Sequence, residues 1–159
     1  MLYVDDVWVV VCDASRAIVY KSQGKVASLL FVKKLEHEES RAHVHDLVSD
    51  RQGRTQQSVS GGGHTSVGHG SRSGMQKAHS PKELEHEQFA IEIAAELTTG
   101  LSQQAYSHLV LIASPHFLGL LRSKLDEHVG KKISHTVDKD YTHLTSEELH
   151  QRLVDTFII

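Results

Sequence analysis

Apolar residues in the first third of the chain fall into short runs separated by turn residues. The run 7–12 is continuously apolar, which is typical of a central strand that is covered on both faces. Two further apolar runs, 17–20 and 26–35, follow turns at 13–15 and 23–24. Connections this short predict three strands that run antiparallel to one another as a meander.

The second half of the chain begins with a strong helix signal. Ser80 is placed as the N-cap, Pro81 as the first helical residue and Glu83 as the residue that closes a capping box. Gly100 is the expected end of this helix. Its apolar face is spaced at helical intervals and comprises Phe89, Ala90, Ile93, Ala94 and Leu97.

Strands and helices then alternate up to the end of the chain. A buried strand at 109–113 precedes a helix that starts at Pro115 and is expected to end at Gly130. A last strand at 133–137 leads to a final helix, for which Thr145 and Glu148 form a second capping box. The apolar stripe of that helix comprises Leu149, Leu153 and Phe157.

The fold class that these elements predict is α/β. Their order is β-β-β-(long loop)-α-β-α-β-α, which predicts a mixed sheet with packed helices and the topology of the ribonuclease-H-like folds. A chain of 159 residues fits one domain, so we expect a single domain over 1–159.

The segment 51–82 differs in composition from the rest of the chain. It holds five basic residues, no acidic residue and seven of the 11 glycines. Its few apolar residues cannot offset the entropy of ordering, so we expect residues 51–79 to form a mobile loop. The formal net charge of the whole chain is −3, so this positive charge is local. Such a loop suits contact with a phosphate-rich partner, and its composition also matches that of an ordinary linker.

Arginines at the root of this loop allow two interpretations. Arg41, Arg51 and Arg54 could contact phosphate groups in the bidentate geometry that guanidinium favours. Arg51 or Arg54 could instead pair with Asp46 or Asp50 and anchor the loop.

A metal-dependent nuclease would need several carboxylates to hold two metal ions. Asp13, after the first strand, is one candidate, and the first helix offers Glu83, Glu85, Glu87 and Glu92. At the end of the strand 109–113, however, the chain reads Ala113-Ser114-Pro115, with no acid. We therefore interpret Asp13 as a turn residue that bonds the local backbone.

The remaining candidate chemistry is sparse. Thirteen histidines occur without a recognisable zinc spacing, and the candidates His37, His43, His45, His64, His69 and His79 are expected to be solvated. Cys12, the only cysteine, should be a buried and inert thiol. The acidic residues of 138–140 could pair with Arg122 or Arg16.

No metal or cofactor is expected, and no secretion signal or membrane-spanning stretch is evident, so a cytoplasmic protein is predicted.

Several sequence stretches carry a resemblance to a known family. They are WVVVCDASRA at 8–17, ESR at 39–41, DLVSDRQGR at 46–54, FA at 89–90, SPHFLGLLR at 114–122 and DKDYT at 138–142. Together they resemble the bacterial family described as protein required for attachment to host cells, over essentially the whole chain.

More distantly, this family resembles the middle domain of archaeal and eukaryotic peptide release factors. That domain carries a long mobile loop between its third strand and first helix, and the Gly-Gly-Gln tip of the loop helps water to attack the ester of peptidyl-tRNA on the ribosome. In this chain Gly61-Gly62-Gly63-His64 is the nearest match to the tip, and histidine in place of glutamine puts peptidyl-tRNA hydrolysis in doubt.

The resemblance implies that the loop binds ribosomal or transfer RNA. The residues implied in this contact are Arg41, Arg51, Arg54, Gly61, Gly62, Gly63, His64, Arg72 and Lys77. The first alternative is a non-catalytic module whose loop docks on another protein. The second is a metal-dependent or histidine-based hydrolase that uses His64 or Asp13.

Overall fold

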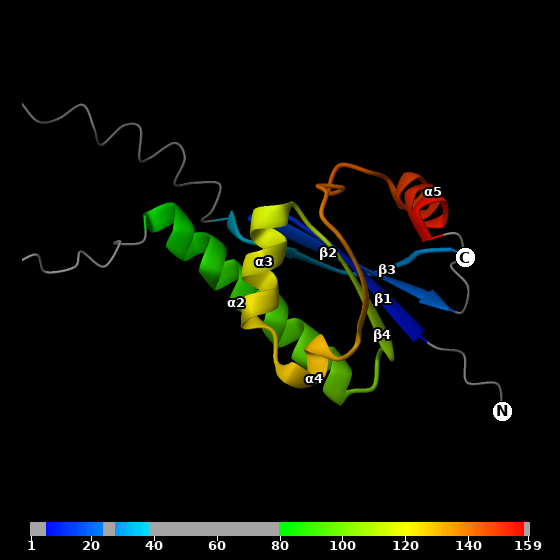
Figure 1. Cartoon of the computed structure of the whole chain (residues 1–159), viewed down its shortest axis with the longest axis horizontal. Helices are drawn as coiled ribbons and strands as arrows, with labels where there is room; N and C mark the ends of the chain where they lie inside the picture. The colour runs from blue at the N-terminus through cyan, green and yellow to red at the C-terminus, as the bar shows by residue number, and fades with distance from the viewer. Residues whose placement is uncertain (1–5, 24–27, 39–79, 158–159) are drawn as a thin grey trace, which may run out of the picture.

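The computed structural model of the chain describes residues 6–23, 28–38 and 80–157. Within these residues a five-stranded mixed sheet packs against four helices (Figure 1). The strand order is β3-β2-β1-β4-β5. The strands are β1 (Asp6–Cys12), β2 (Arg16–Gln23), β3 (Leu30–Glu36), β4 (His108–Ile112) and β5 (Ile133–Val137). The helices are α2 (Pro81–Ser102), α3 (Pro115–Lys124), α4 (Glu127–Gly130) and α5 (Ser146–Phe157). The predicted mixed α/β architecture is confirmed.

Strand β1 occupies the centre of the sheet. It pairs antiparallel with β2, where Val9 faces Tyr20, and parallel with β4, where Val9 faces Val110. Because β1 is paired on both sides and covered on both faces, the last four residues of its apolar run are almost fully buried, as the sequence pattern predicts: Val9, Val10, Val11 and Cys12.

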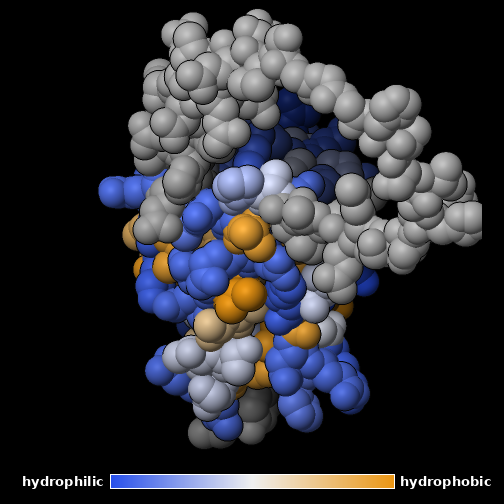
Figure 2. Space-filling view, turned by 90° about the vertical axis from the view of Figure 1, so that its left-hand side faces the viewer, coloured by the Kyte–Doolittle hydropathy of each residue, from blue (hydrophilic) through white to orange (hydrophobic). Residues whose placement is uncertain are grey.

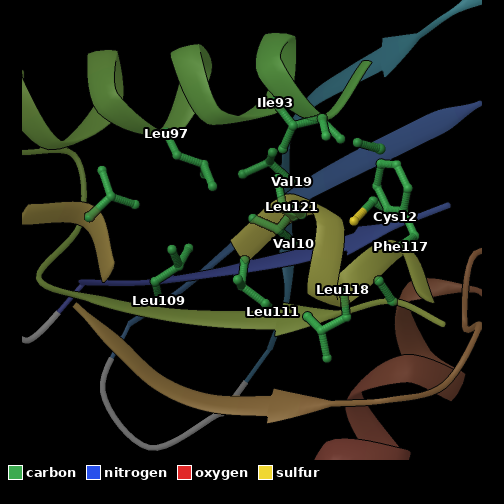
Figure 3. Close-up of a cluster of buried hydrophobic side chains, with 14 of the residues drawn as sticks. Val10, Cys12, Val19, Ile93, Leu97, Leu109, Leu111, Phe117, Leu118 and Leu121 are labelled. Carbon is green, nitrogen blue, oxygen red and sulfur yellow. The ribbon is translucent and has the colours of Figure 1, made fainter. Parts of the chain in front are cut away.

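The two faces of the sheet carry separate cores. Val10 and Cys12 point to the face that is covered by α2 and α3, in a cluster with Phe89, Leu97 and Leu121 (Figure 3). The intervening residues of β1 point to the opposite face, where α5 supplies Leu149 and Leu153. Each fully buried side chain of this size contributes about 1.5–3 kcal/mol to folding.

Helix α2 begins as the sequence predicts. The Ser80 hydroxyl accepts a hydrogen bond from the Glu83 amide, and the Glu83 carboxylate accepts one from the Ser80 amide, which completes the capping box. Its predicted end is wrong, because the helix continues past Gly100 to Ser102. The residue in the left-handed region is Gln104, with φ of 55°.

Gly100 is required for packing rather than for termination. A Cβ atom at this position would lie 2.6 Å from Cη2 of Trp8 and 3.2 Å from Cε1 of Tyr106. The two aromatic rings pack on each other with centroids 4.9 Å apart, and the Tyr106 hydroxyl donates a hydrogen bond to the Leu97 carbonyl. The glycine therefore lets α2 approach this aromatic pair closely.

The helix expected from Pro115 to Gly130 is divided in two. Its backbone becomes extended at Leu125, with φ of −72° and ψ of 140°. The Asp126 carboxylate then accepts a hydrogen bond from the His128 amide and caps the short helix α4. An N-capping residue inside a helical pattern can start a new helix, and here it does so.

The other elements lie close to their predicted positions. The Thr145–Glu148 capping box of α5 is present, and β5 covers 133–137 as expected. Strand β3 begins at Leu30 rather than at residue 26, and the predicted turn residue Gly24 lies outside the described residues.

Gly100→Ala is expected to lower the free energy of unfolding by about 1–3 kcal/mol, because the added methyl group overlaps the Trp8 ring. Gly119→Ala in the middle of α3 is the matched control, since no atom lies within 4 Å of a Cβ at that position. It should stabilise the protein by about 0.5–1 kcal/mol through helix propensity. Urea unfolding of both variants measures the difference, and a Gly100→Ala protein as stable as wild type would contradict the packing argument.

Candidate functional site

Four of the five strands point in one direction, so their carboxyl ends meet at one edge of the sheet. Strands β1, β4 and β5 are mutually parallel, and β3 is parallel to them because both β1 and β3 are antiparallel to β2. Asp13, His37 and Ser114 follow three of these strands. We call this the carboxyl edge. Ligands of open α/β sheets bind at such an edge, which makes it the first place to examine.

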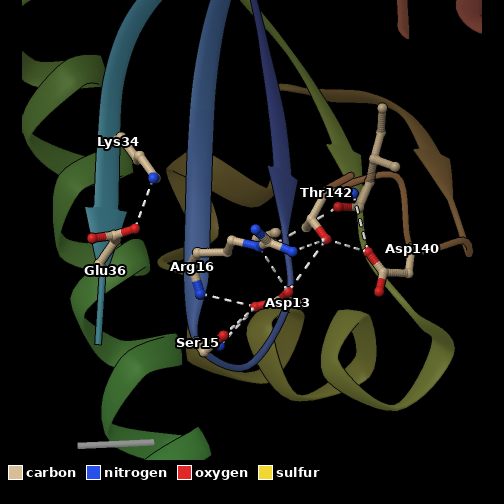
Figure 4. A network of polar contacts seen from close by, with 9 residues as sticks. Asp13, Ser15, Arg16, Lys34, Glu36, Asp140 and Thr142 are labelled. Atoms are coloured by element: carbon tan, nitrogen blue, oxygen red, sulfur yellow. Dashed lines mark hydrogen bonds and ion pairs between the residues drawn. The ribbon is translucent and has the colours of Figure 1, made fainter. Parts of the chain in front are cut away.

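Asp13 is the centre of a polar network at the carboxyl edge (Figure 4). Its Oδ1 atom accepts hydrogen bonds from the amides of Ser15 and Arg16, both at 2.8 Å, and from the Ser15 hydroxyl at 3.0 Å. Its Oδ2 atom accepts a hydrogen bond from Nε of Arg16 at 3.3 Å. Both oxygens of the carboxylate are thus occupied by groups of the β1–β2 turn itself.

The network continues into the loop between β5 and α5. The buried Thr142 lies within reach of Asp13, at 3.3 Å from hydroxyl oxygen to Oδ2, and donates its stronger hydrogen bond to Oδ1 of Asp140 at 2.6 Å. Nη2 of Arg16 donates to the same hydroxyl at 3.4 Å. The acidic run 138–140 therefore meets Arg16 through Thr142, whereas the sequence predicted a direct pair with Arg16 or Arg122.

The electrostatics of Asp13 favour an ionised carboxylate at neutral pH. Burial alone would raise the pKa of Asp13, but the hydrogen bonds from the Ser15 and Arg16 amides outweigh it, and the net pKa is lower than usual. An ionised carboxylate of lowered pKa is a poor general base, and most of the acceptor capacity of this one is used within the β1–β2 turn. This supports the interpretation of Asp13 as a turn residue.

His37 forms a second contact at the same edge. Its Nε2 atom lies 2.7 Å from Oε2 of Glu85 on α2, and its ring stacks on Phe89 with centroids 5.5 Å apart. Its backbone amide donates to the Ser15 carbonyl at 2.9 Å. His37 was expected to be solvated, but it is buried, because this contact joins the end of β3 to α2.

The carboxylates of α2 are used in contacts with neighbouring elements. Glu83 closes the capping box, Glu85 meets His37, and Glu87 pairs with Lys124 of α3. Further along, Glu96 pairs with Lys33 of β3 at 2.8 Å. In the described parts of the chain no three His, Cys, Asp or Glu side chains are grouped so that they could hold a metal ion. These acids therefore position α2 and do not assemble a two-metal site.

Two other titratable groups near this edge have shifted pKa values. Burial and the positive charges of Lys82 and His116 lower the pKa of His86, so its imidazole is neutral at pH 7. Burial, with the negative charges of Asp13 and Asp140, raises the pKa of the Cys12 thiol far above its usual value. Cys12 is inert, as the sequence indicates.

Of the residues predicted for the RNA contact and the two catalytic candidates, Asp13 and His64, the structure describes Asp13 alone. The others lie outside the described residues: Arg41, Arg51, Arg54, Gly61, Gly62, Gly63, His64, Arg72 and Lys77. Sequence reasoning did not single out Thr142 at the carboxyl edge, and it predicted a solvated His37 where the structure buries that residue. The Asp140-x-Thr142 spacing is a local turn signal that could have drawn attention to Thr142, whereas no sequence signal connects His37 with Glu85.

Asp13→Asn is expected to lower the free energy of unfolding at pH 7 by about 1–3 kcal/mol, because an amide group would face the Arg16 guanidinium. The lowered pKa makes the carboxylate stabilising above the unfolded-state pKa of about 4, and that stability is lost as pH falls through the folded-state pKa. Urea unfolding from neutral to acidic pH should show the two proteins converging below about pH 4. A difference that stays constant with pH would contradict the ionised role.

His37→Ala is expected to speed amide hydrogen exchange at the end of β3 and in the first turns of α2, while β1 and β4 keep their protection. His116→Ala, at an exposed position of α3, is the control and should change neither region. Uniform loss of protection over the whole sheet would contradict a local anchoring role.

Comparison with known proteins adds one finding. The model of a protein family described as "Protein required for attachment to host cells" matches residues 8–153. A search of curated proteins finds no match. Among the helices of the described residues, none has both the length and the apolar character that crossing a bilayer demands. The match covers nearly the whole chain, including most of β1, the carboxyl edge and most of α5, so this chain belongs to the family of proteins required for attachment to host cells.

Proposed function

We propose that this protein is a non-catalytic, translation-associated binding module that contacts ribosomal or transfer RNA through residues 51–79. In this proposal the domain has a ribonuclease-H-like fold, as does the middle domain of archaeal and eukaryotic peptide release factors. The support for the fold is the strand order β3-β2-β1-β4-β5, in which β2 alone is antiparallel to its neighbours.

The observation that carries the proposal is the contact between the described residues on either side of segment 39–79. His37, just before the segment, lies 2.7 Å from Glu85, just after it. The His37 amide also bonds to the β1–β2 turn. Fixing both ends of a binding segment to one rigid edge lowers the entropy that the segment loses when it binds a partner.

The charge distribution supports a phosphate-rich partner for this segment. Residues 51–82 hold basic residues and no acidic residue, whereas acidic residues outnumber basic ones in the described parts of the chain. The candidate contacts are Arg41, Arg51, Arg54, Arg72 and Lys77, with Gly61, Gly62, Gly63 and His64 allowing close approach of the backbone.

The chemistry of the carboxyl edge supports binding rather than catalysis. Asp13 is the one predicted catalytic candidate among the described residues, and its oxygens already accept hydrogen bonds from the β1–β2 turn. With histidine at position 64 in place of the release-factor glutamine, we propose recognition of RNA without peptidyl-tRNA hydrolysis.

The family description favours a second candidate function. A protein required for attachment to host cells could act through another protein, with segment 51–79 as the docking element. The two functions differ in salt dependence, because phosphate contacts release counterions and protein docking does so far less.

The Arg51→Ala, Arg54→Ala and Arg72→Ala triple variant is expected to lose most of its co-sedimentation with ribosomes. The plot of log affinity against log salt concentration should become shallower by about 2, since three phosphate contacts are removed. The control is the triple variant Lys131→Ala, Lys132→Ala and Lys139→Ala, which makes the same charge change at exposed positions of the domain. A variant lacking residues 61–74 tests the segment as a whole.

The outcomes separate the two candidates. Ribosome binding that is steep in salt and lost only in the arginine variant supports RNA recognition. Equal loss in both triple variants would mean that net charge alone matters, and no ribosome binding by wild type would overturn the translation-associated role and leave the docking role.

A further inference from the structure

Three basic side chains gather where α2 and α3 begin, beside the carboxyl edge. They are Lys82 and His86 of α2 and His116 of α3. Lys82 and His86 are four residues apart, so they lie on the same face of α2. Phe117, next to His116, stacks on Phe89 of α2 with ring centroids 6.2 Å apart, which brings the start of α3 against this face. We call Lys82, His86 and His116 the α2–α3 corner.

The basic groups of the α2–α3 corner are not used by the rest of the described structure. Lys82 and His116 are exposed and His86 is half-buried, and none of the three forms a hydrogen bond or ion pair with a described residue. Two carboxylates affect the charge state of His86, and both are already engaged: Glu83 in the capping box and Asp13 in the β1–β2 turn. The corner therefore has donors that no described carboxylate occupies.

The surface around the start of α2 favours a charged ligand over an apolar one. Figure 2 shows the end of the molecule at which α2 begins, and the described residues visible there are mostly hydrophilic, with hydrophobic residues occurring singly. Single exposed apolar residues are ordinary and do not indicate an apolar docking surface.

The positions of Lys82 and His116 do not stabilise their own helices. Each is the second residue of its helix, directly after the proline with which the helix begins. The amino end of a helix carries partial positive charge, which disfavours a cation there and favours an anion. A basic side chain at each of two neighbouring helix starts is explained by an anion that both side chains contact.

We propose that Lys82, His86 and His116 together bind one phosphate group. Ammonium and imidazolium groups both donate charge-assisted hydrogen bonds to phosphate oxygens. The source of the phosphate rests on the proposed function: it belongs to the backbone of the RNA that segment 51–79 contacts. Residue 79 precedes Lys82 by three positions, so their Cα atoms are at most about 11 Å apart and one RNA strand can reach both.

The charges around His86 make this binding depend on pH. Burial and the positive charges of Lys82 and His116 lower the pKa of His86, while the negative charges of Glu83 and Asp13 act in the opposite direction. A phosphate beside the ring would offset the two positive charges and raise the pKa of His86. By linkage, the affinity for phosphate should rise as pH falls through the titration of His86, because the protonated ring binds the anion better.

Histidine NMR spectra between about pH 5 and 8, with and without sodium sulfate at constant ionic strength, test the proposal. Sulfate is tetrahedral like phosphate, and its charge does not change over this range. It should raise the midpoint of the His86 titration by about one pH unit, because a nearby opposite charge favours the protonated ring. His128, exposed on α4, is the internal control, and its midpoint should not move. His86→Gln assigns the signal.

A double variant and its matched control separate this site from a general effect of charge. Lys82→Ala with His116→Gln should remove most of the response of His86 to sulfate. Lys132→Ala with His128→Gln makes the same substitutions at other exposed positions and should keep the response. Circular dichroism of each variant confirms that it is folded. A His86 midpoint that sulfate does not move in wild type, or equal loss of the response in both double variants, would overturn the proposal.

A short oligouridylate in place of sulfate tests whether RNA supplies the phosphate. It should raise the His86 midpoint as sulfate does, and a response to sulfate alone would overturn the assignment to RNA while supporting the anion site. Co-sedimentation with ribosomes tests the proposed function separately. Ribosome binding that depends on the segment arginines, with no response of His86 to sulfate, would overturn this site alone. A response of His86 without ribosome binding would support the site and overturn the translation-associated role.

Discussion

The need to bury both faces of β1 is the constraint on which the other elements of this structure depend. The residues from Val9 to Cys12 alternate between the two faces and are almost fully buried. One face therefore requires α2 and α3, and the other requires α5. Because β1 also pairs on both sides, its carboxyl end lies in the middle of the carboxyl edge, and Asp13 stands where that strand must turn. The position of the polar network is thus a consequence of the apolar run before it.

Polar contacts at and near the carboxyl edge connect elements that come from different parts of the sequence. The Asp13 network ties the β1–β2 turn to the loop before α5, and Glu85, Glu87 and Glu96 tie α2 to β3 and α3. The exposed pair of Lys33 with Glu96 contributes at most about 1 kcal/mol by itself. Together these contacts determine which segments meet at this edge, and so where segment 39–79 leaves and rejoins the domain. The carboxylates of this edge are already engaged in contacts that join elements of the domain.

Sequence reasoning succeeded where the physics is local. The capping box depends on Ser80 and Glu83, which are three positions apart, so it could be predicted. The continuous apolar residues of β1 indicate directly that this strand is buried, so its burial could be predicted too. Sequence reasoning failed where the role of a residue depends on a partner that is distant in the sequence. The sequence around Gly100 indicates a helix end, because no local pattern shows that this glycine packs against Trp8, which is far away in the sequence. For the same reason Thr142 and His37 gave no clear signal, since their partners Asp13 and Glu85 come from other elements.

The parallel pairing of β1 with β4 also governs how the chain can fold during synthesis. Strands β1, β2 and β3 are neighbours in sequence and can associate as soon as they leave the ribosome. Val7, however, pairs with His108, so one side of the most apolar strand stays open until most of the chain has been made. Contacts between such distant residues slow folding and expose intermediates to aggregation. During synthesis, the side of β1 that faces β4 in the folded protein therefore lacks its partner strand until residue 108 and those after it have been made.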